Sequence, residues 1–301
     1  MKHIVGLAMM MPLCIFAACK SSEAPNAEPS SDPYAPPNVS VAELPAYVRA
    51  QINAMREQAG LTSLLAYPEL HESAQAHANY VASGVAPREL HEEIPGTPGF
   101  TAVSAAERAA DAKFVEVLMG EWVALKGDAS VVPLWLEAPF SRVVLLQPNA
   151  KYMGMATAAG QWGDADVLLV GRRASEPVPD EGVVVWPVDG AKEVPHRWNG
   201  SAISPALPEP PDRWPSGPVI SAIFAPESDV MLTGHTLDTD SGEAVPHVVV
   251  DPKGPLAPYL DGHITLYPEA PLTPKTTYTL TLEATVNGKA WSSKSTFTTR
   301  P

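Results

Sequence analysis

The sequence predicts an α+β domain followed by an all-β domain. In the first half of the chain, apolar residues recur at intervals of three and four, which is the spacing of one helix face. After Arg173 no helical period returns, and short runs rich in β-branched residues alternate with turn residues. Helices followed by hairpin-joined strands are typical of an α+β layered domain.

The N-terminus has the pattern of a bacterial secretory signal. Lys2 precedes an apolar run from Ile4 to Ala18, which is too short to cross a bilayer as a helix. The run ends Ile15-Phe16-Ala17-Ala18-Cys19 and resembles a lipobox, so we expect residues 1–18 to be removed and Cys19 to be lipidated. The alternative is an ordinary cleavage site with a leftover cysteine, which needs a small residue where Phe16 stands.

Residues 19–39 are predicted to be a tether. Residues 20–39 contain five prolines and almost no bulky aliphatic residues, a composition that buries too little apolar surface to fold. In an extended, proline-rich form they would reach about 60 Å, at about 3.1 Å per residue. Beside a lipidated cysteine, this segment would hold the folded part away from the membrane.

Charge and cysteine content exclude two classes of protein. The formal net charge is −14 and no cluster of Lys or Arg offsets it, so we expect no nucleic-acid partner. The second cysteine, Cys14, lies inside the signal, so Cys19 is left alone in the mature chain. An intramolecular disulfide, common in exported proteins, is therefore excluded.

A first domain is expected over residues 40–174. Its first helix carries the stripe Leu44, Val48, Ile52 and Met55 and ends at Gly60. Ser40 and Glu43 resemble a capping box, but Pro45 fits best in the first turn, so we expect the helix to start at Leu44. The further elements expected are helices at Pro68–Gly84, from the cap Ser104 onward and at Pro133–Glu137, and strands at Lys151–Ala159 and Asp166–Arg172.

A second domain is expected over residues 180–301, after a linker at residues 174–182. Seven short strands with turn signals between them favour a β-sandwich. The pair Asn287-Gly288 is a hairpin signal between the last two strands. The strands expected are Val183–Val188, Val219–Phe224, Val230–Thr233, Val248–Val250, His263–Tyr267, Thr277–Thr285 and Lys294–Thr299.

The stretch from His91 to Gly154 carries a family resemblance. It contains the segments Gly96-Thr97-Pro98-Gly99-Phe100-Thr101, Phe114–Leu118 and Trp135-Leu136-Glu137-Ala138-Pro139-Phe140-Ser141-Arg142. With the upstream segments Ile52–Arg56 and Ala74–Ala78, this stretch resembles the CAP superfamily, and specifically its cysteine-poor, bacterial SCP-like branch. The resemblance implies an α-β-α sandwich for residues 40–174.

The C-terminal part has a second resemblance. Its ending, from Pro268 through Tyr278 to Phe297-Thr298-Thr299, resembles bacterial Ig-like modules, and the segment from Pro187-Val188-Asp189-Gly190-Ala191 through Val194-Pro195 resembles their first strand. The resemblance implies an Ig-like β-sandwich for residues 180–301.

The CAP resemblance also implies a cleft with two histidines and two glutamates, and in some members the histidines hold zinc. His91 matches the first histidine, and Glu116 matches the first glutamate by its place in Phe114–Leu118. Ser141 stands where the second histidine is expected, and Glu121 is a candidate for the second glutamate by proximity alone. Zinc prefers three or four nitrogen, sulfur or carboxylate ligands. We therefore expect no bound metal or other cofactor, with His91 as a weak ligand at most.

Other residues are assigned structural roles. His71 and His77 are six residues apart, so on a helix they do not share a face, and we expect His77 to be a hydrogen-bonded core residue. No serine stands in a Gly-x-Ser-x-Gly turn. Trp186, Trp198 and Trp214 could stack on sugars, but packing at the junction of the two domains is the preferred interpretation.

These observations predict an exported bacterial lipoprotein of the outer membrane. We expect a surface-tethered, non-enzymatic binding or scaffold protein with an envelope or extracellular ligand. One alternative is a hydrolase of envelope material that uses His91 and Glu116. The other is a carrier of an apolar, lipid-like or sterol-like ligand.

Overall fold

In the computed structural model, residues 37–301 form one compact unit. The structure describes residues 37–84, 90–161, 163–175, 183–200, 206–250, 252–260 and 262–301. The predicted signal, Cys19, most of the tether and most of the linker lie outside these residues. Within them, no helix is both long enough and apolar enough to cross a membrane.

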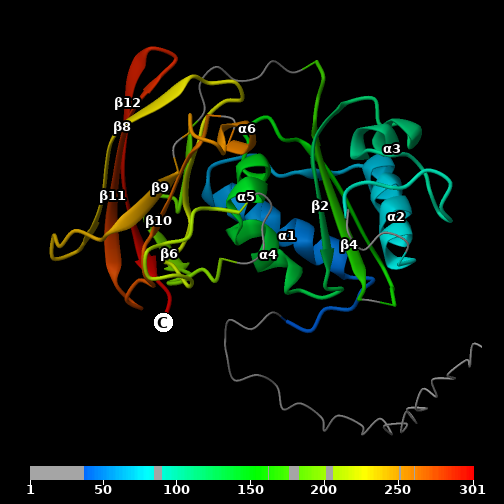
Figure 1. Cartoon of the computed structure of the whole chain (residues 1–301), viewed down its shortest axis with the longest axis horizontal. Coiled ribbons are helices and arrows are strands. Elements are labelled where there is room, and N and C mark those ends of the chain that lie inside the picture. Colours follow the sequence, from blue (N-terminus) through cyan, green and yellow to red (C-terminus); the bar gives the residue numbers. More distant parts are fainter. Residues whose placement is uncertain are drawn as a thin grey trace, which may run out of the picture. The chain divides into compact units, whose positions relative to one another are not determined.

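The N-terminal part is a four-stranded sheet with helices on both faces (Figure 1). The strand order is β1-β3-β4-β2, with β1 parallel to β3 and the other pairs antiparallel. The elements are α1 (Leu44–Gln58), β1 (Leu65–Ala66), α2 (Pro68–Ala82), α3 (Ala105–Asp111), β2 (Val117–Leu125), α4 (Val131–Glu137), α5 (Pro139–Leu145), β3 (Tyr152–Ala158) and β4 (Ala165–Arg172).

Successive side chains of the central strand β4 pack in two different helix layers. Leu168 and Val170 pack in one core cluster with residues of α1, α4 and α5. Val167 and Leu169 pack in another with residues of α2 and α3. Successive side chains of a strand point to opposite faces, so this uninterrupted apolar run is explained by helices on both sides. The mixed α/β character expected for this part is confirmed.

The predicted helix signals act as expected. The α1 stripe is buried, Pro45 lies in the first turn and Gly60 follows the helix with φ of +70°. Ser104 caps α3 with a complete capping box: its hydroxyl accepts from the Glu107 amide, and the Glu107 carboxylate accepts from the Ser104 amide. These signals are local, which is why sequence reasoning finds them.

Three elements of this part are not predicted from the sequence: the two-residue strand β1, strand β2 and helix α5. Strand β2 has no clean alternation, contains Gly120 and has an irregular register between Leu118 and Gly120. Helix α5 follows α4 directly, with Pro139 in its first turn, so two short helices stand where one was expected. Gly154 on β3 shows how closely the layers pack, because a Cβ there would lie 2.2 Å from the Leu70 carbonyl carbon of α2.

The C-terminal part contains two four-stranded sheets, ordered β5-β7-β10-β9 and β6-β12-β11-β8. One core cluster takes residues from both sheets, such as Ile264 of β10 and Leu280 of β11, so the sheets share a core. The elements are β5 (Val184–Trp186), β6 (Ala191–Val194), β7 (Ile220–Ile223), β8 (Val230–Thr239), β9 (His247–Val250), α6 (Ala257–Leu260), β10 (Ile264–Pro268), β11 (Thr277–Val286) and β12 (Lys289–Thr299).

All seven expected strands are present, and two expectations need correction. Residues 191–194, expected at the end of the strand that starts at Val183, form a separate edge strand β6, which pairs in parallel with β12. A four-residue helix, α6, stands where no helix was expected. The Asn287-Gly288 hairpin is confirmed, since both residues have positive φ, 49° and 75°, as a tight hairpin turn requires.

The two parts share a buried junction. The Arg142 guanidinium on α5 donates to the Val219 carbonyl at 2.6 Å, and the Gln147 side chain contacts the Phe224 carbonyl and His263. Trp186 packs against a cluster that contains Val143 and Leu146. Trp198 and Trp214 share a cluster with Phe140. The three tryptophans therefore have the predicted packing role.

Candidate functional site

A cluster of five polar side chains around the middle of β2 is the candidate site. We call it the Glu121 cluster: Glu121 on β2, Arg108 on α3, His77 on α2, and His91 and Glu93 on the segment between α2 and α3. Four of these side chains are almost completely buried, whereas the His91 side chain is 59 % exposed. The cluster therefore reaches solvent mainly through one imidazole.

Arg108 binds Glu121 in a two-point ion pair. Its Nη2 donates to both carboxylate oxygens of Glu121, at 2.7 and 2.9 Å. The same guanidinium also donates to backbone carbonyls, including that of His91 at 3.1 Å. Charge-assisted bonds of this kind are among the stronger ones in proteins, so Glu121 is firmly held.

His77 is held on both sides of its ring. Nδ1 lies 2.9 Å from the Glu93 carboxylate, and Nε2 lies 2.9 Å from the Leu90 carbonyl. Both partners are acceptors, so both ring nitrogens donate only in the imidazolium form. Glu93 also accepts from the amide and hydroxyl of Thr101. His77 is thus the hydrogen-bonded core residue that the sequence analysis expects.

Glu121 remains ionised within this network. Burial acts to raise the pKa of Glu121, but the hydrogen bond to His91 and the charges of His77 and Arg108 outweigh it, so the pKa lies below its usual value. His91 Nδ1 is 3.3 Å from Glu121 Oε1. The Arg108 guanidinium, 2.7 Å from Glu121 Oε2, compensates the buried negative charge of Glu121.

The zinc ion implied by the family resemblance does not fit these residues. Among the described residues, no group of three or more His, Cys, Asp or Glu side chains is arranged to hold a metal. Arg108 occupies both oxygens of the carboxylate nearest to His91, and a guanidinium cannot act as a ligand. The donor set is that of an internal ion-pair network.

The three predicted cleft residues, His91, Glu116 and Ser141, have different hydrogen-bond partners. The Glu116 carboxylate accepts from the Ala174 amide at 2.7 Å. Ser141 is buried on α5, and its hydroxyl reaches only the Ala138 carbonyl, at 3.5 Å. Among the described residues, His91, Glu116 and Ser141 share no hydrogen bond or ion pair. Glu121, named for its proximity, is the glutamate that meets His91.

Two members of the cluster, Glu93 and Arg108, are missed by the sequence analysis. Arg108 has a weak signal, because it precedes the buried Ala109 on the short helix α3 and is itself buried. A charged side chain on a buried helix face requires a partner. Glu93 has no comparable signal, since three acidic and imidazole residues in a row, His91-Glu92-Glu93, do not reveal which one turns inward.

A cavity of about 510 Å³ lies beside the sheet edge, outside the Glu121 cluster. It is bounded by α1, β1, the start of α2 and β3, and its lining is mostly apolar. The polar side chains in this lining are Arg49, Tyr67 and His71. The Nδ1 atom of His71 lies 2.7 Å from the Met155 carbonyl and therefore donates to it, which leaves Nε2 as an acceptor.

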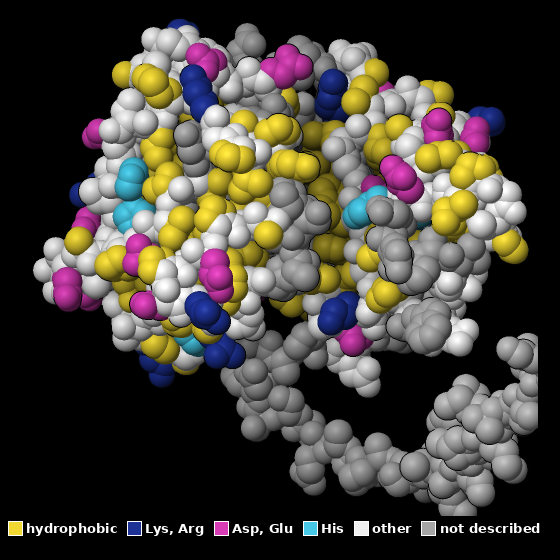
Figure 2. Space-filling model, viewed as in Figure 1, with side chains coloured by type: hydrophobic (Ala, Val, Ile, Leu, Met, Phe, Trp, Pro, Cys, Tyr) yellow, Lys and Arg dark blue, Asp and Glu magenta, His cyan; other side chains and the backbone are white. Residues whose placement is uncertain are grey.

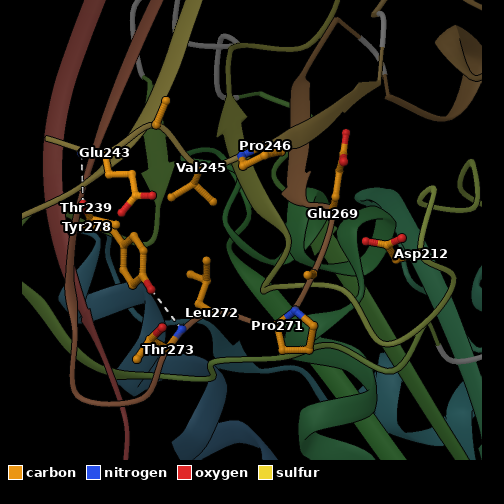
Figure 3. A pocket seen from close by; sticks show the side chains of 12 residues that line it. Asp212, Thr239, Glu243, Val245, Pro246, Glu269, Pro271, Leu272, Thr273 and Tyr278 are labelled. Carbon is orange, nitrogen blue, oxygen red and sulfur yellow. Dashed lines mark hydrogen bonds between the residues drawn. The ribbon is translucent and has the colours of Figure 1, made fainter.

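A smaller pocket, of about 270 Å³, lies in the C-terminal part (Figure 3). Leu272, Val245 and Pro246 supply apolar surface, and no lysine or arginine is among its described lining residues. Its carboxylates belong to Asp212, Glu243 and Glu269. The Tyr278 hydroxyl accepts from the Thr273 amide at 2.9 Å, so the buried end of the pocket is already hydrogen-bonded.

Basic side chains do not gather on the visible surface. On the face shown in Figure 2, lysine and arginine side chains are spread out and form no broad patch. This distribution agrees with the acidic composition and offers no polyanion-binding surface on that face.

Residues 49–170 match the family described as CAP: Cysteine-rich secretory protein family. No curated protein matches the sequence. An outer surface protein of Borrelia burgdorferi is similar at 19 % identity, covering 46 % of this chain and 98 % of that one, with a TM-score of 0.38.

A second solved structure is an extracellular, SCP-domain protein of Bacillus anthracis str. Ames. It is 18 % identical, with a TM-score of 0.33, over 43 % of this chain and 42 % of that one. This chain thus spans less than half of that protein's length. The family match and the layered fold lead to one assignment: residues 49–170 of this chain are a CAP domain.

Proposed function

We propose that this protein is an exported, membrane-tethered binding protein whose Glu121 cluster stabilises the fold rather than catalysing a reaction. The observation that supports this is the two-point ion pair between Arg108 and Glu121, at 2.7 and 2.9 Å. A general base must be free to take a proton from the substrate. Glu121 is committed to Arg108, and His77 to Glu93 and Leu90.

The hydrolase alternative would have to rely on His91. Its imidazole is the exposed group of the cluster, and one imidazole can act as a base. Among the described residues, however, it contacts neither Glu116 nor a hydroxyl that it could activate as a nucleophile. Ser141 is buried on α5, where its hydroxyl donates to the Ala138 carbonyl.

The cavity of about 510 Å³ favours a ligand of a particular kind. Its size lies within the range of about 300–1,000 Å³ that is usual for small-molecule sites. Apolar walls with a cationic Arg49 suit an amphiphile with an acidic group, and Nε2 of His71 can accept a hydrogen bond from the protonated acid. We therefore favour the carrier alternative as the more specific form of the binding function.

The tether and the C-terminal part complete the proposal. Lipidation at Cys19 would make the membrane a partner through the anchor, and the Lys20 that follows favours the outer membrane. The two sheets with a shared core support an Ig-like sandwich for residues 180–301, which would serve as a scaffold that presents the CAP domain. The ligand itself would come from the envelope or the surroundings.

Ligand binding can be tested by titrating a fluorescent alkyl carboxylate into the mature chain. The chain carries Cys19→Ser, so it has no lipid anchor and can be purified without detergent. Ala46→Trp should block binding, because Ala46 is an exposed α1 residue that lines the cavity. Ala50→Trp is the matched control: it is exposed one turn further along the same helix and does not line the cavity. Equal binding by both variants would contradict the cavity assignment.

Catalysis can be tested separately on purified envelope material. We expect no hydrolysis above that of a heat-denatured sample. Hydrolysis that disappears in His91→Ala and persists in Ala50→Trp would contradict the binding function and restore the enzyme.

A further inference from the structure

A hairpin in the C-terminal part brings two histidines together. Strand β8 is followed by a turn in which the Val245 amide donates to the Leu237 carbonyl at 2.8 Å. Asp238 and Ala244 form an antiparallel bridge in the same register. In the same register, His235, two residues before Leu237, lies opposite His247, two residues after Val245. Directly opposite residues of an antiparallel pair have neighbouring side chains.

The two imidazoles are in direct contact. His235 Nδ1 lies 2.7 Å from His247 Nε2, with ring centroids 4.9 Å apart and the rings at 76°. His247 Nδ1 lies 2.8 Å from the Val245 carbonyl, so it donates there and leaves a lone pair on Nε2. In the neutral pair, His235 Nδ1 therefore donates its proton to His247 Nε2 in this hydrogen bond.

We propose that His235 and His247 form a two-nitrogen site for a divalent transition-metal ion, with Cu²⁺ as the preferred ion. The neutral His235 ring needs only to change tautomer, losing the proton at Nδ1 and gaining one at Nε2 from solvent. Two lone pairs then face the ion, and no net proton is released. The Val245 carbonyl orients His247 as an outer-shell partner does in metal sites.

The spacing of the nitrogens selects the geometry. Imidazole–metal bonds of about 2.0 Å place two ligands about 2.8 Å apart at a right angle and about 3.3 Å apart in a tetrahedron. The 2.7 Å separation is closer to the right-angled arrangement, which Cu²⁺ and Ni²⁺ prefer in nitrogen and oxygen surroundings. A small rotation of the exposed His235 ring would aim both lone pairs at one point.

Two further features support the site. Partial desolvation of the His235 ring, and after it the neighbouring His247, lower the pKa of His235. Among the described residues no third His, Cys, Asp or Glu joins the pair, so water completes the coordination. Such a site is open to solvent and lies apart from the Glu121 cluster, so it does not depend on the proposed binding function.

The test is a titration of the full mature chain, with Cys19→Ser, by CuCl₂ in a non-chelating buffer. Calorimetry should show one copper bound per chain. Electron paramagnetic resonance of the complex should show the signal of tetragonal Cu²⁺. Loss of an outer-shell partner already costs about 10–100-fold in metal affinity, so His235→Asn and His247→Asn should each weaken binding at least about tenfold. His196→Asn, which removes an imidazole that lies outside the hairpin and outside the Glu121 cluster, should leave copper affinity unchanged.

A second measurement does not depend on variants. Copper added far below one equivalent should broaden the imidazole proton signals of His235 and His247 in the wild type before those of other histidines. Copper binding that both hairpin variants retain, broadening that falls first on other histidines, or no copper binding at all would each overturn the proposal. Tighter binding of Zn²⁺ than of Cu²⁺ would overturn the preferred geometry.

Discussion

Arg108 and Glu121 are joined by a bidentate contact of 2.7 and 2.9 Å, between side chains that are 1 % and 4 % exposed. The pair connects α3 to β2, and the guanidinium also holds the His91 carbonyl. One arginine thus links the segment that carries His91 to the sheet. This contact therefore stabilises the arrangement of the polar residues in the Glu121 cluster.

Arg108→Met should lower the free energy of unfolding by about 3–5 kcal/mol, because it leaves Glu121 as an uncompensated buried charge. Urea unfolding monitored by circular dichroism measures the change. The double variant Arg108→Met/Glu121→Leu should lose less than the sum of the two single variants, since both charges are then gone. Arg197→Met, at an exposed arginine, should change stability by no more than about 0.5 kcal/mol. A similar small effect at Arg108 would contradict the stabilising role.

Acid should destabilise the protein through His263 at the junction. His263 is fully buried, its Nδ1 accepts from the Phe224 amide at 2.9 Å, and burial lowers its pKa to about 4. Its pKa in the unfolded chain is about 6.5, so the unfolded state binds the proton first as the pH falls. The stability present above about pH 6.5 should therefore be lost progressively down to about pH 4, by up to about 3 kcal/mol.

Unfolding free energies measured from pH 7 to pH 4.5 would check this. His263→Asn offers a carbonyl to the Phe224 amide and has no proton to bind, so it should flatten this part of the profile. His91→Asn should leave the profile steep, as the His91 side chain is largely exposed. Identical profiles for the wild type and His263→Asn would show that His263 is not the titrating group.

Separate expression of residues 40–174 and 180–301 tests the predicted division into domains. The first piece should give a mixed helix–strand circular-dichroism spectrum and the second a spectrum that is nearly all β. Because Leu146 and Ile223 are completely buried in a shared cluster, the two pieces should also associate when mixed. Gel filtration would measure the association. A strongly helical spectrum from the second piece would refute the assignment.

Cys19→Ser tests the lipid anchor. If Cys19 is lipidated, the variant should leave the membrane pellet or accumulate as an unprocessed precursor, because a serine hydroxyl cannot form the thioether. Fractionation followed by immunoblotting measures this. Membrane partitioning that is unchanged from the wild type would contradict lipidation of Cys19 as the anchor.

Prediction from the sequence succeeded where the signal was local. The α1 stripe, the Ser104 capping box and the Asn287-Gly288 turn each depend on residues within a few positions of one another. Strand β2 was missed because its pairing with β4, about 50 residues away, and its irregular register between Leu118 and Gly120 override a weak local pattern. For the same reason, β6 was not predicted as a strand separate from β5, since it pairs with β12 about 100 residues later.

By itself, the sequence determined most of the helices and strands, the net acidic charge and the candidate position of His91, because periodicity, turn chemistry and charge are readable along the chain. Only the tertiary structure decided which carboxylate meets that histidine. Glu116 and Glu121 are five residues apart, yet one bonds the Ala174 amide and the other bonds Arg108 and His91. Which partner each carboxylate meets is set by the packing of α3 and the segment before it against β2, and by the return of the chain after β4. These contacts span 13 to 58 residues.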